Sequence, residues 1–152
     1  MQVFLAGIMQ ANRNDNQIED QSYRVQISNA LKAKMPNVQI IDPWALNPNS
    51  VTYDDQTAFE TFHAMTKLAG DADLLIAYLP KVSMGTAMEM WQAHQNGTYI
   101  IAVTPYVHHW AIRFTANEIL PDLDTLLHQI ENGRIPQLLH TLTKVDGSPN
   151  GD

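Results

Sequence analysis

The sequence predicts a single α/β domain, in which a doubly wound, mostly parallel sheet lies between two layers of helices. Segments that are apolar throughout alternate along the chain with longer segments whose apolar residues recur at helical spacing. Strands that are apolar on both faces are typical of a parallel sheet covered on each side. The length of 152 residues and the hydrophobic content of 45% suit one ordinary core rather than two.

The first strand and the first helix are predicted in the N-terminal quarter of the chain. Residues 3–8 form an apolar run that gives way near Gly7 to the polar loop 9–16, as expected of a buried strand entering a loop. A helix is expected over 18–35, and Pro36 ends it. The apolar positions of this helix are Ile18, Val25, Ile27, Ala30, Leu31 and Met35.

A second strand and a second helix follow. The β-branched segment 38–41 predicts a short strand, which opens into the loop 44–49. The helix expected over 54–69 ends at Gly70. Its apolar positions are Ala58, Phe59, Phe62, Met65, Leu68 and Ala69.

The rest of the chain continues the alternation. Strands are predicted over 73–79 and 99–104, with a helix over 86–95 between them. One or two helices are expected over 117–145. We therefore expect one domain over 1–145 and a flexible tail over 146–152, which is rich in Gly, Pro and Asn.

Composition excludes several classes of function. Nine Lys and Arg stand against 16 Asp and Glu, a net charge of −7, which argues against a nucleic-acid polymer or an anionic membrane as partner. The absence of cysteine excludes a disulfide scaffold, a thiolate nucleophile and a zinc–cysteine site. The first residues have no basic segment before their apolar run, and no apolar stretch has the length of a membrane span. A cytoplasmic protein without a metal or cofactor is the expectation.

The predicted site lies in the loops at the carboxyl ends of the strands, where open parallel sheets bind ligands. The candidate residues in these loops are Gly7, Ile8, Arg13, Trp44, Ser83, Gly85, His108 and His109. Ser83 and Gly85 precede a helix, whose free amides and dipole favour an anion. The chain has neither the glycine pattern of dinucleotide-binding folds nor that of a P-loop.

Glu89, in the first turn of this helix, has two interpretations. If it faces the crevice, it is a carboxylate in an apolar wall, a setting for nucleophilic or acid–base chemistry. Thr86 and Glu89 also have the spacing of a capping box, in which the carboxylate only stabilises the helix start. The sequence leaves both interpretations open.

Three motifs together resemble the nucleoside 2-deoxyribosyltransferase superfamily. They are Phe-Leu-Ala-Gly at 4–7, Asp-Ala-Asp-Leu-Leu-Ile-Ala at 71–77, and Ser83-x-Gly85-x-x-x-Glu89 followed by Ala93 and Gly97. The resemblance covers about two thirds of the chain and agrees with the predicted architecture, a flavodoxin-like or Rossmann-like three-layer sandwich. It implies that Glu89 is the nucleophile that attacks the anomeric carbon of a nucleoside.

Two residues resemble one branch of that superfamily. Members acting on free nucleosides usually carry aspartate at the position of Ser83, and the branch that hydrolyses nucleoside 5′-monophosphates carries serine. A hydroxyl at a helix N-terminus can donate to a phosphate that a carboxylate would repel. The Gly7-to-Arg13 spacing also resembles that branch and implies a guanidinium for the phosphate.

The expected activity is therefore hydrolysis of the N-glycosidic bond of a nucleoside or deoxynucleoside 5′-monophosphate. The first alternative is a deoxyribosyltransferase that exchanges bases on free deoxynucleosides. The second is a nucleotide-binding protein without turnover, because the second carboxylate that members often carry before the third strand is missing here.

Other residues have roles that the resemblance suggests. His63 stands nearest to the missing carboxylate and is a candidate proton donor, although a lone histidine on a helix is more often a surface or core residue. Trp44 is a candidate to stack on the base, with core packing as the alternative. Because members of the superfamily form dimers that complete each other's sites, His108 and His109 are candidates to contact a second subunit of a homodimer.

Overall fold

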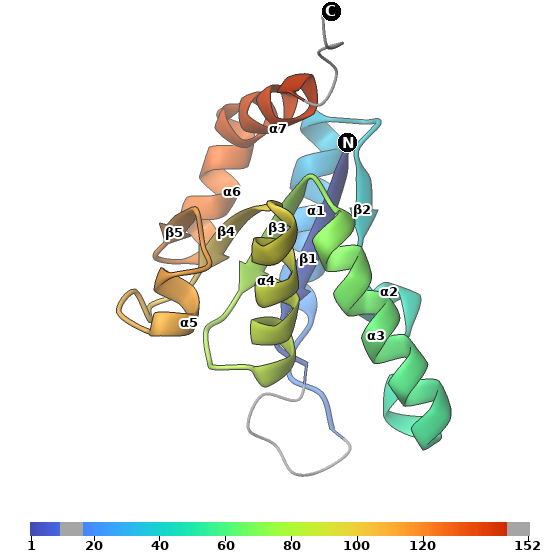
Figure 1. Ribbon diagram of the computed structural model, residues 1–152. Coiled ribbons are helices and arrows are strands. Elements are labelled where there is room, and N and C mark those ends of the chain that lie inside the picture. Colours follow the sequence, from blue (N-terminus) through green and yellow to red (C-terminus); the bar gives the residue numbers. More distant parts are fainter. Residues whose placement is uncertain (10–16, 146–152) are drawn as a thin grey trace, which may run out of the picture.

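The computed structural model describes residues 1–9 and 17–145 and has a five-stranded, all-parallel sheet with strand order β2-β1-β3-β4-β5 (Figure 1). The strands are β1 (Gln2–Gly7), β2 (Gln39–Ile41), β3 (Leu74–Tyr78), β4 (Tyr99–Val103) and β5 (Glu118–Leu120). The predicted α/β class and parallel sheet are confirmed. The fifth strand was not predicted, and here the expectation of helix over 117–145 is wrong at its start: residues 118–120 form a strand that begins with the charged Glu118 and so lacks a continuous apolar run.

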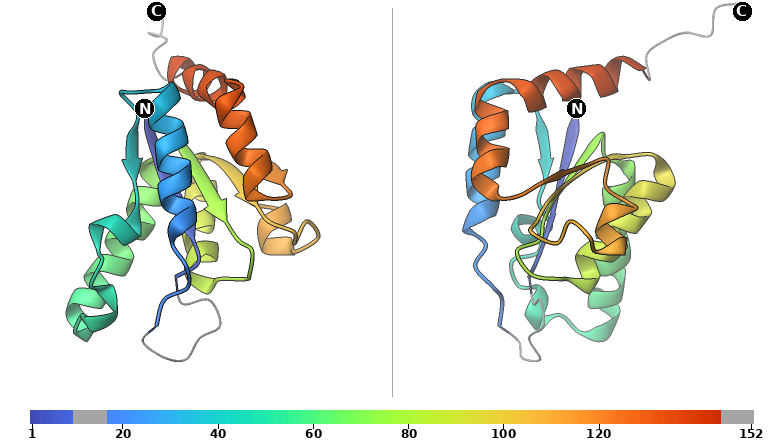
Figure 2. Two further views of the ribbon diagram at one scale, coloured as in Figure 1. Left: turned by 180° about the vertical axis from the view of Figure 1, so that it is seen from behind. Right: turned by 90° about the vertical axis from the view of Figure 1, so that its left-hand side faces the viewer.

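Helices cover both faces of the sheet, which confirms the doubly wound arrangement. They are α1 (Ser22–Lys34), α2 (Pro43–Leu46), α3 (Asp55–Asp71), α4 (Met84–Asn96), α5 (Trp110–Arg113), α6 (Leu123–Glu131) and α7 (Arg134–Val145), with a 3₁₀ turn, η1 (Ser50–Thr52). Helices α3, α4 and α5 pack on one face (Figure 1), and α1, α6 and α7 on the other (Figure 2).

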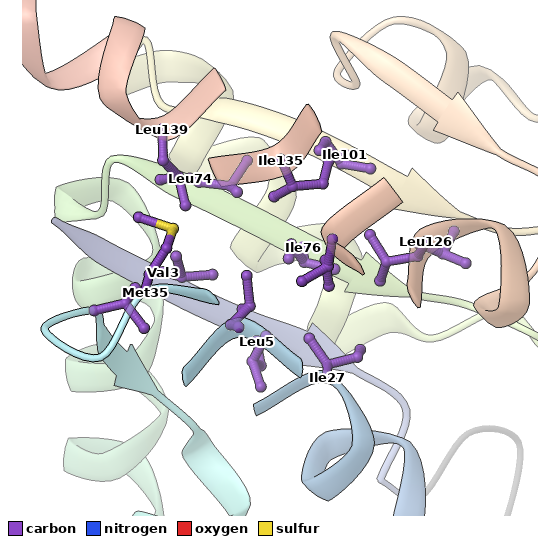
Figure 3. Close-up of a cluster of buried hydrophobic side chains, with 14 of the residues drawn as sticks. Val3, Leu5, Ile27, Met35, Leu74, Ile76, Ile101, Leu126, Ile135 and Leu139 are labelled. Atoms are coloured by element: carbon purple, nitrogen blue, oxygen red, sulfur yellow. The ribbon is translucent and has the colours of Figure 1, made fainter. Parts of the chain in front are cut away.

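The core has two halves because successive strand residues point to opposite faces of the sheet. Val3 and Leu5 pack with Ile27 of α1 and Leu126 of α6 (Figure 3). Phe4 and the residues of β3 and β4 that point to the same face of the sheet pack instead against Ala69 of α3 and against α4. Both halves are fully buried, so the strand ends that carry the site rest on a rigid frame.

Several predicted boundaries are corrected. Helix α1 begins at Ser22 rather than residue 18, and the loop expected over 44–49 contains most of α2. Helix α3 continues through Gly70, because the glycine serves packing and does not end the helix: a Cβ there would lie 2.6 Å from Nδ2 of Asn96 on α4. That amide donates to the Gly70 carbonyl at 3.1 Å.

Two predictions fall on residues that the structure does not describe. Arg13, the proposed phosphate ligand, and the tail 146–152 lie outside the described ranges. Within residues 1–9 and 17–145, no helix is both long enough and apolar enough to cross a membrane.

Candidate active site

A cleft of about 590 Å³ opens at the carboxyl end of β1, between α3, α4 and the segment 43–53. Four residues singled out from the sequence line it: Gly7, Ser83, Gly85 and Glu89. The remaining wall is mostly apolar, with Met65 from α3 and Met88 from α4. A mostly apolar cleft with a small number of polar groups is typical of a small-molecule site.

The N-terminus of α4 opens into this cleft. Ser83 is its N-cap, and the Oγ of Ser83 accepts hydrogen bonds from the amide of Thr86 at 3.3 Å and from the Thr86 hydroxyl at 3.1 Å. Because this oxygen acts as acceptor towards Thr86, its own hydrogen is available to a ligand. A Cβ built on Gly85 would meet nothing within 4 Å, so open space adjoins the first turn. This arrangement is suited to an anion.

Glu89 lies one turn further along α4 and is 9% exposed. Among the described residues, its carboxyl group has no hydrogen-bond partner. Burial raises the pKa of Glu89 to about 8, and the charge of Arg24 acts in the opposite direction. Since the cap is Ser83 and not Thr86, Glu89 does not stand at the capping-box position, and the structure favours the interpretation as a buried carboxyl group facing the crevice.

Arg24, on α1, lies behind the cleft wall at Gly7 and was not singled out from the sequence. It is 1% exposed, and its guanidinium donates to the carbonyls of Leu5 at 2.6 Å and Gly7 at 3.3 Å. It also forms an ion pair with Asp42 at 3.0 Å, and its Nε donates to Oε1 of Gln21 at 2.6 Å. The signal was present in the sequence, because Arg24, Ile27 and Leu31 have the i, i+3, i+7 spacing of a core-facing stripe.

Gly7 lies at the cleft with Arg24 and Tyr23 close behind it. A Cβ on Gly7 would lie 2.2 Å from the hydroxyl oxygen of Tyr23, so only glycine fits without displacing the tyrosine. The Tyr23 hydroxyl donates to the carbonyl of Ile8 at 3.4 Å. Ile8 itself is buried and does not line the cleft.

The other predicted residues are not brought to the cleft. His63 is exposed on α3, with its ring 4.3 Å from that of Phe59. Trp44 is partly buried on α2 outside the cleft lining, and His108 and His109 are exposed after β4. In the described part of the chain, no three His, Cys, Asp or Glu side chains are grouped so that they could hold a metal ion.

Comparisons with known proteins give a likeness of fold. No family model matches the sequence, and no curated protein matches it either. A 2-deoxyribosyltransferase from the psychrotolerant bacterium Bacillus psychrosaccharolyticus superposes with a TM-score of 0.64 at 15% identity, over 91% of this chain and 96% of that one. A conserved protein from Enterococcus faecalis superposes with a TM-score of 0.59 at 15% identity, over 87% of this chain and 98% of that one. The three-layer fold is therefore that of a solved deoxyribosyltransferase structure.

Proposed function

We propose that this protein is an N-glycosidase that hydrolyses a nucleoside or deoxynucleoside 5′-monophosphate to the free base and a sugar 5-phosphate. The observation that carries the proposal is Glu89, a buried carboxyl group without a described hydrogen-bond partner at the wall of a cleft that the N-terminus of α4 enters. The fold likeness to a 2-deoxyribosyltransferase supports chemistry at an N-glycosidic bond.

In the proposed mechanism, the Glu89 carboxylate attacks C1′ of the sugar. The C1′–N bond breaks, its electron pair leaves with the base, and the base takes a proton from water. A second water then attacks C1′ and gives its proton to the hydroxide that the first water left, which frees the carboxylate and gives the sugar phosphate with retained configuration. Because only the ionised carboxylate attacks, and burial raises the pKa of Glu89 to about 8, we expect kcat/KM to rise with pH towards that value.

The phosphate is proposed to bind at the N-terminus of α4, held by Ser83, the amide of Gly85 and Arg13. The free hydrogen on the Ser83 hydroxyl and the helix dipole support this placement. Binding energy from the phosphate then holds C1′ against Glu89. A Ser83→Asp substitution places a carboxylate beside the phosphate, so we expect it to lower activity on monophosphates by more than tenfold and to spare free nucleosides.

Base exchange on free deoxynucleosides is the second candidate, favoured by the fold likeness to a 2-deoxyribosyltransferase. A binding protein without turnover is the third, since no second carboxylate lines the described part of the cleft. Incubation with a panel of nucleosides and monophosphates, with and without an acceptor base, separates the three. Base release from monophosphates alone supports hydrolysis, exchange that requires an acceptor supports transfer, and binding without release supports the third.

We also propose a cytoplasmic homodimer. Met84, Met88 and Trp91 form one face of α4 and are 87%, 49% and 54% exposed, and Trp110 of the neighbouring α5 is 76% exposed. Two of these residues, Met84 and Met88, also line the cleft, so a second copy packed on this face would narrow the cleft as well. Sedimentation equilibrium tests this point: a dimer at micromolar concentration is expected, and a monomer contradicts it.

A further inference from the structure

We propose that Arg24 and Asp42 form a positioning pair that sets the pH at which Glu89 ionises, and so the pH range in which the protein is active. This inference rests on the proposed function for its link to activity. The effect on Glu89 itself can be measured without any turnover.

Arg24 is fixed where β1 and β2 separate. The two strands pair only as far as Phe4 and Ile41, and the Arg24 guanidinium binds the carbonyls of Leu5 and Gly7 beyond that point. The guanidinium thus satisfies the β1 carbonyls that a longer β2 would otherwise satisfy. This end of β1 is also where the cleft opens. Gly7 accepts from Arg24 and also lines the cleft with Glu89, so the fixed charge lies one residue behind the cleft wall.

Asp42 is fixed by the same network. Its Oδ1 accepts from Arg24 and from the amide of Trp44, both at 3.0 Å, so the carboxylate caps α2 while it pairs with the guanidinium. Arg24 favours the charged form of Glu89, and an anion bound to Arg24 reduces that field. We therefore expect Asp42 to act on Glu89 through Arg24, with the sign opposite to that of Arg24 itself.

Few other titratable groups of the described residues lie around Glu89. Helix α3 faces the cleft with Ala58, Thr61, Phe62 and Met65, and the described lining has one further titratable side chain, Tyr53. Tyr23, on α1, is buried, and burial raises the pKa of its hydroxyl, with Arg24 lowering it and Asp42 and Glu89 adding to the rise. Of the charged residues described here, Arg24 is the cation in electrostatic reach of Glu89.

The direct experiment is an NMR titration of the Glu89 side-chain carboxyl carbon in uniformly ¹³C-labelled protein, with the signal assigned from its loss in the Glu89→Gln variant. The Arg24→Gln variant removes the cation, and we expect the titration midpoint to rise by about one pH unit or more. The Arg24→Lys variant retains the charge but loses the fork of hydrogen bonds, and should titrate near the wild-type midpoint. The Asp42→Asn variant retains a side-chain oxygen that can cap α2 but removes the negative charge beside Arg24, so the Glu89 midpoint should fall.

The results separate a charge effect from a packing effect. Shifts of opposite sign in Arg24→Gln and Asp42→Asn, with Arg24→Lys near the wild type, support the proposal. Equal shifts in Arg24→Gln and Arg24→Lys, or an unmoved midpoint in Asp42→Asn, overturn it. If Arg24→Gln does not fold, a lower midpoint in Asp42→Asn together with a wild-type midpoint in Arg24→Lys supports the proposal, and an unmoved midpoint in Asp42→Asn overturns it.

The link to activity is tested separately by the acid limb of kcat/KM against pH, which should move with the NMR midpoint in each variant. An acid limb that stays fixed while the midpoint moves overturns the link. If no base is released from any substrate while the midpoints move as stated, the proposed function fails and the charge effect on Glu89 stands.

Discussion

Arg24 and Glu89 are both ionisable side chains buried near the end of β1, and they differ in what surrounds them. Arg24 has two backbone carbonyls, Gln21 and a carboxylate as partners, all within hydrogen-bond distance. Glu89 has apolar neighbours, open cleft space and no described hydrogen-bond partner. A buried charge whose hydrogen bonds are satisfied supports the structure, whereas a carboxyl group left without partners weakens the fold and is available for chemistry.

Removing the Glu89 carboxyl group should have the largest effect. We expect the Glu89→Gln variant to lose at least about a thousandfold in kcat for base release, because the amide cannot form the glycosyl bond. Its KM for a monophosphate should change little, since the phosphate is held by other groups. The matched control is Glu60→Gln, an exposed glutamate on α3, which should retain wild-type kinetics.

Removing Arg24 should instead cost stability. In the Arg24→Met variant two carbonyls and Asp42 lose their charged partner, and we expect the free energy of unfolding to fall by about 3 kcal/mol. Urea denaturation monitored by circular dichroism measures the change. The same substitution at the exposed Arg113 is the control, and an equal loss in both variants would show that Arg24 is not a structural centre.

The Glu89→Gln variant should be more stable than the wild type, and only at neutral to alkaline pH. The unfolded chain releases the Glu89 proton near the ordinary value of 4.5, whereas the folded protein holds it until about pH 8. Wild-type stability therefore falls as pH rises through this window, and the neutral amide avoids that loss. We expect equal free energies of unfolding at pH 4 and a gain of a few kcal/mol for the variant at pH 9. A difference that is constant with pH would contradict the burial of Glu89 as the cause.

A smaller effect is expected at Gly7, whose carbonyl accepts from Arg24 and which lines the cleft with Glu89. The Gly7→Ala substitution forces its methyl group against the buried Tyr23 hydroxyl, and we expect a loss of about 1–3 kcal/mol in the free energy of unfolding. Gly85→Ala is the control, because its methyl group meets open space within a helix, and its stability should be unchanged or slightly higher. Thermal melts of the two variants compare them directly.

The sequence predicted four of the five strands and the residues that line the α4 side of the candidate cleft, because both depend on patterns within one segment. Apolar runs marked β1, β3 and β4, and Ser83, Gly85 and Glu89 stand within one turn and its helix. Contacts between segments that are distant in the sequence could not be predicted, because neither segment alone contains a pattern that indicates them. Gly70 shows no sign in its own helix of the Asn96 side chain that packs against it.

The phase of α1 shows why Arg24 was missed. The predicted apolar positions included Val25, which is 61% exposed, while Arg24 beside it faces the core. The prediction assumed that the apolar residues of the helix face the core. At this turn the core-facing position is instead taken by a guanidinium that contacts the ends of β1 and β2. A charged residue in register with Ile27 and Leu31 was the available indication.

The central claim is that Glu89 attacks the anomeric carbon of a nucleotide. Mass spectrometry of the acid-quenched wild-type protein, after mixing with deoxynucleoside 5′-monophosphates, tests it most directly. We expect an added deoxyribose phosphate on the peptide that contains Glu89, and no adduct in the Glu89→Gln variant. Undiminished base release by that variant, or an adduct on another residue, would contradict the claim.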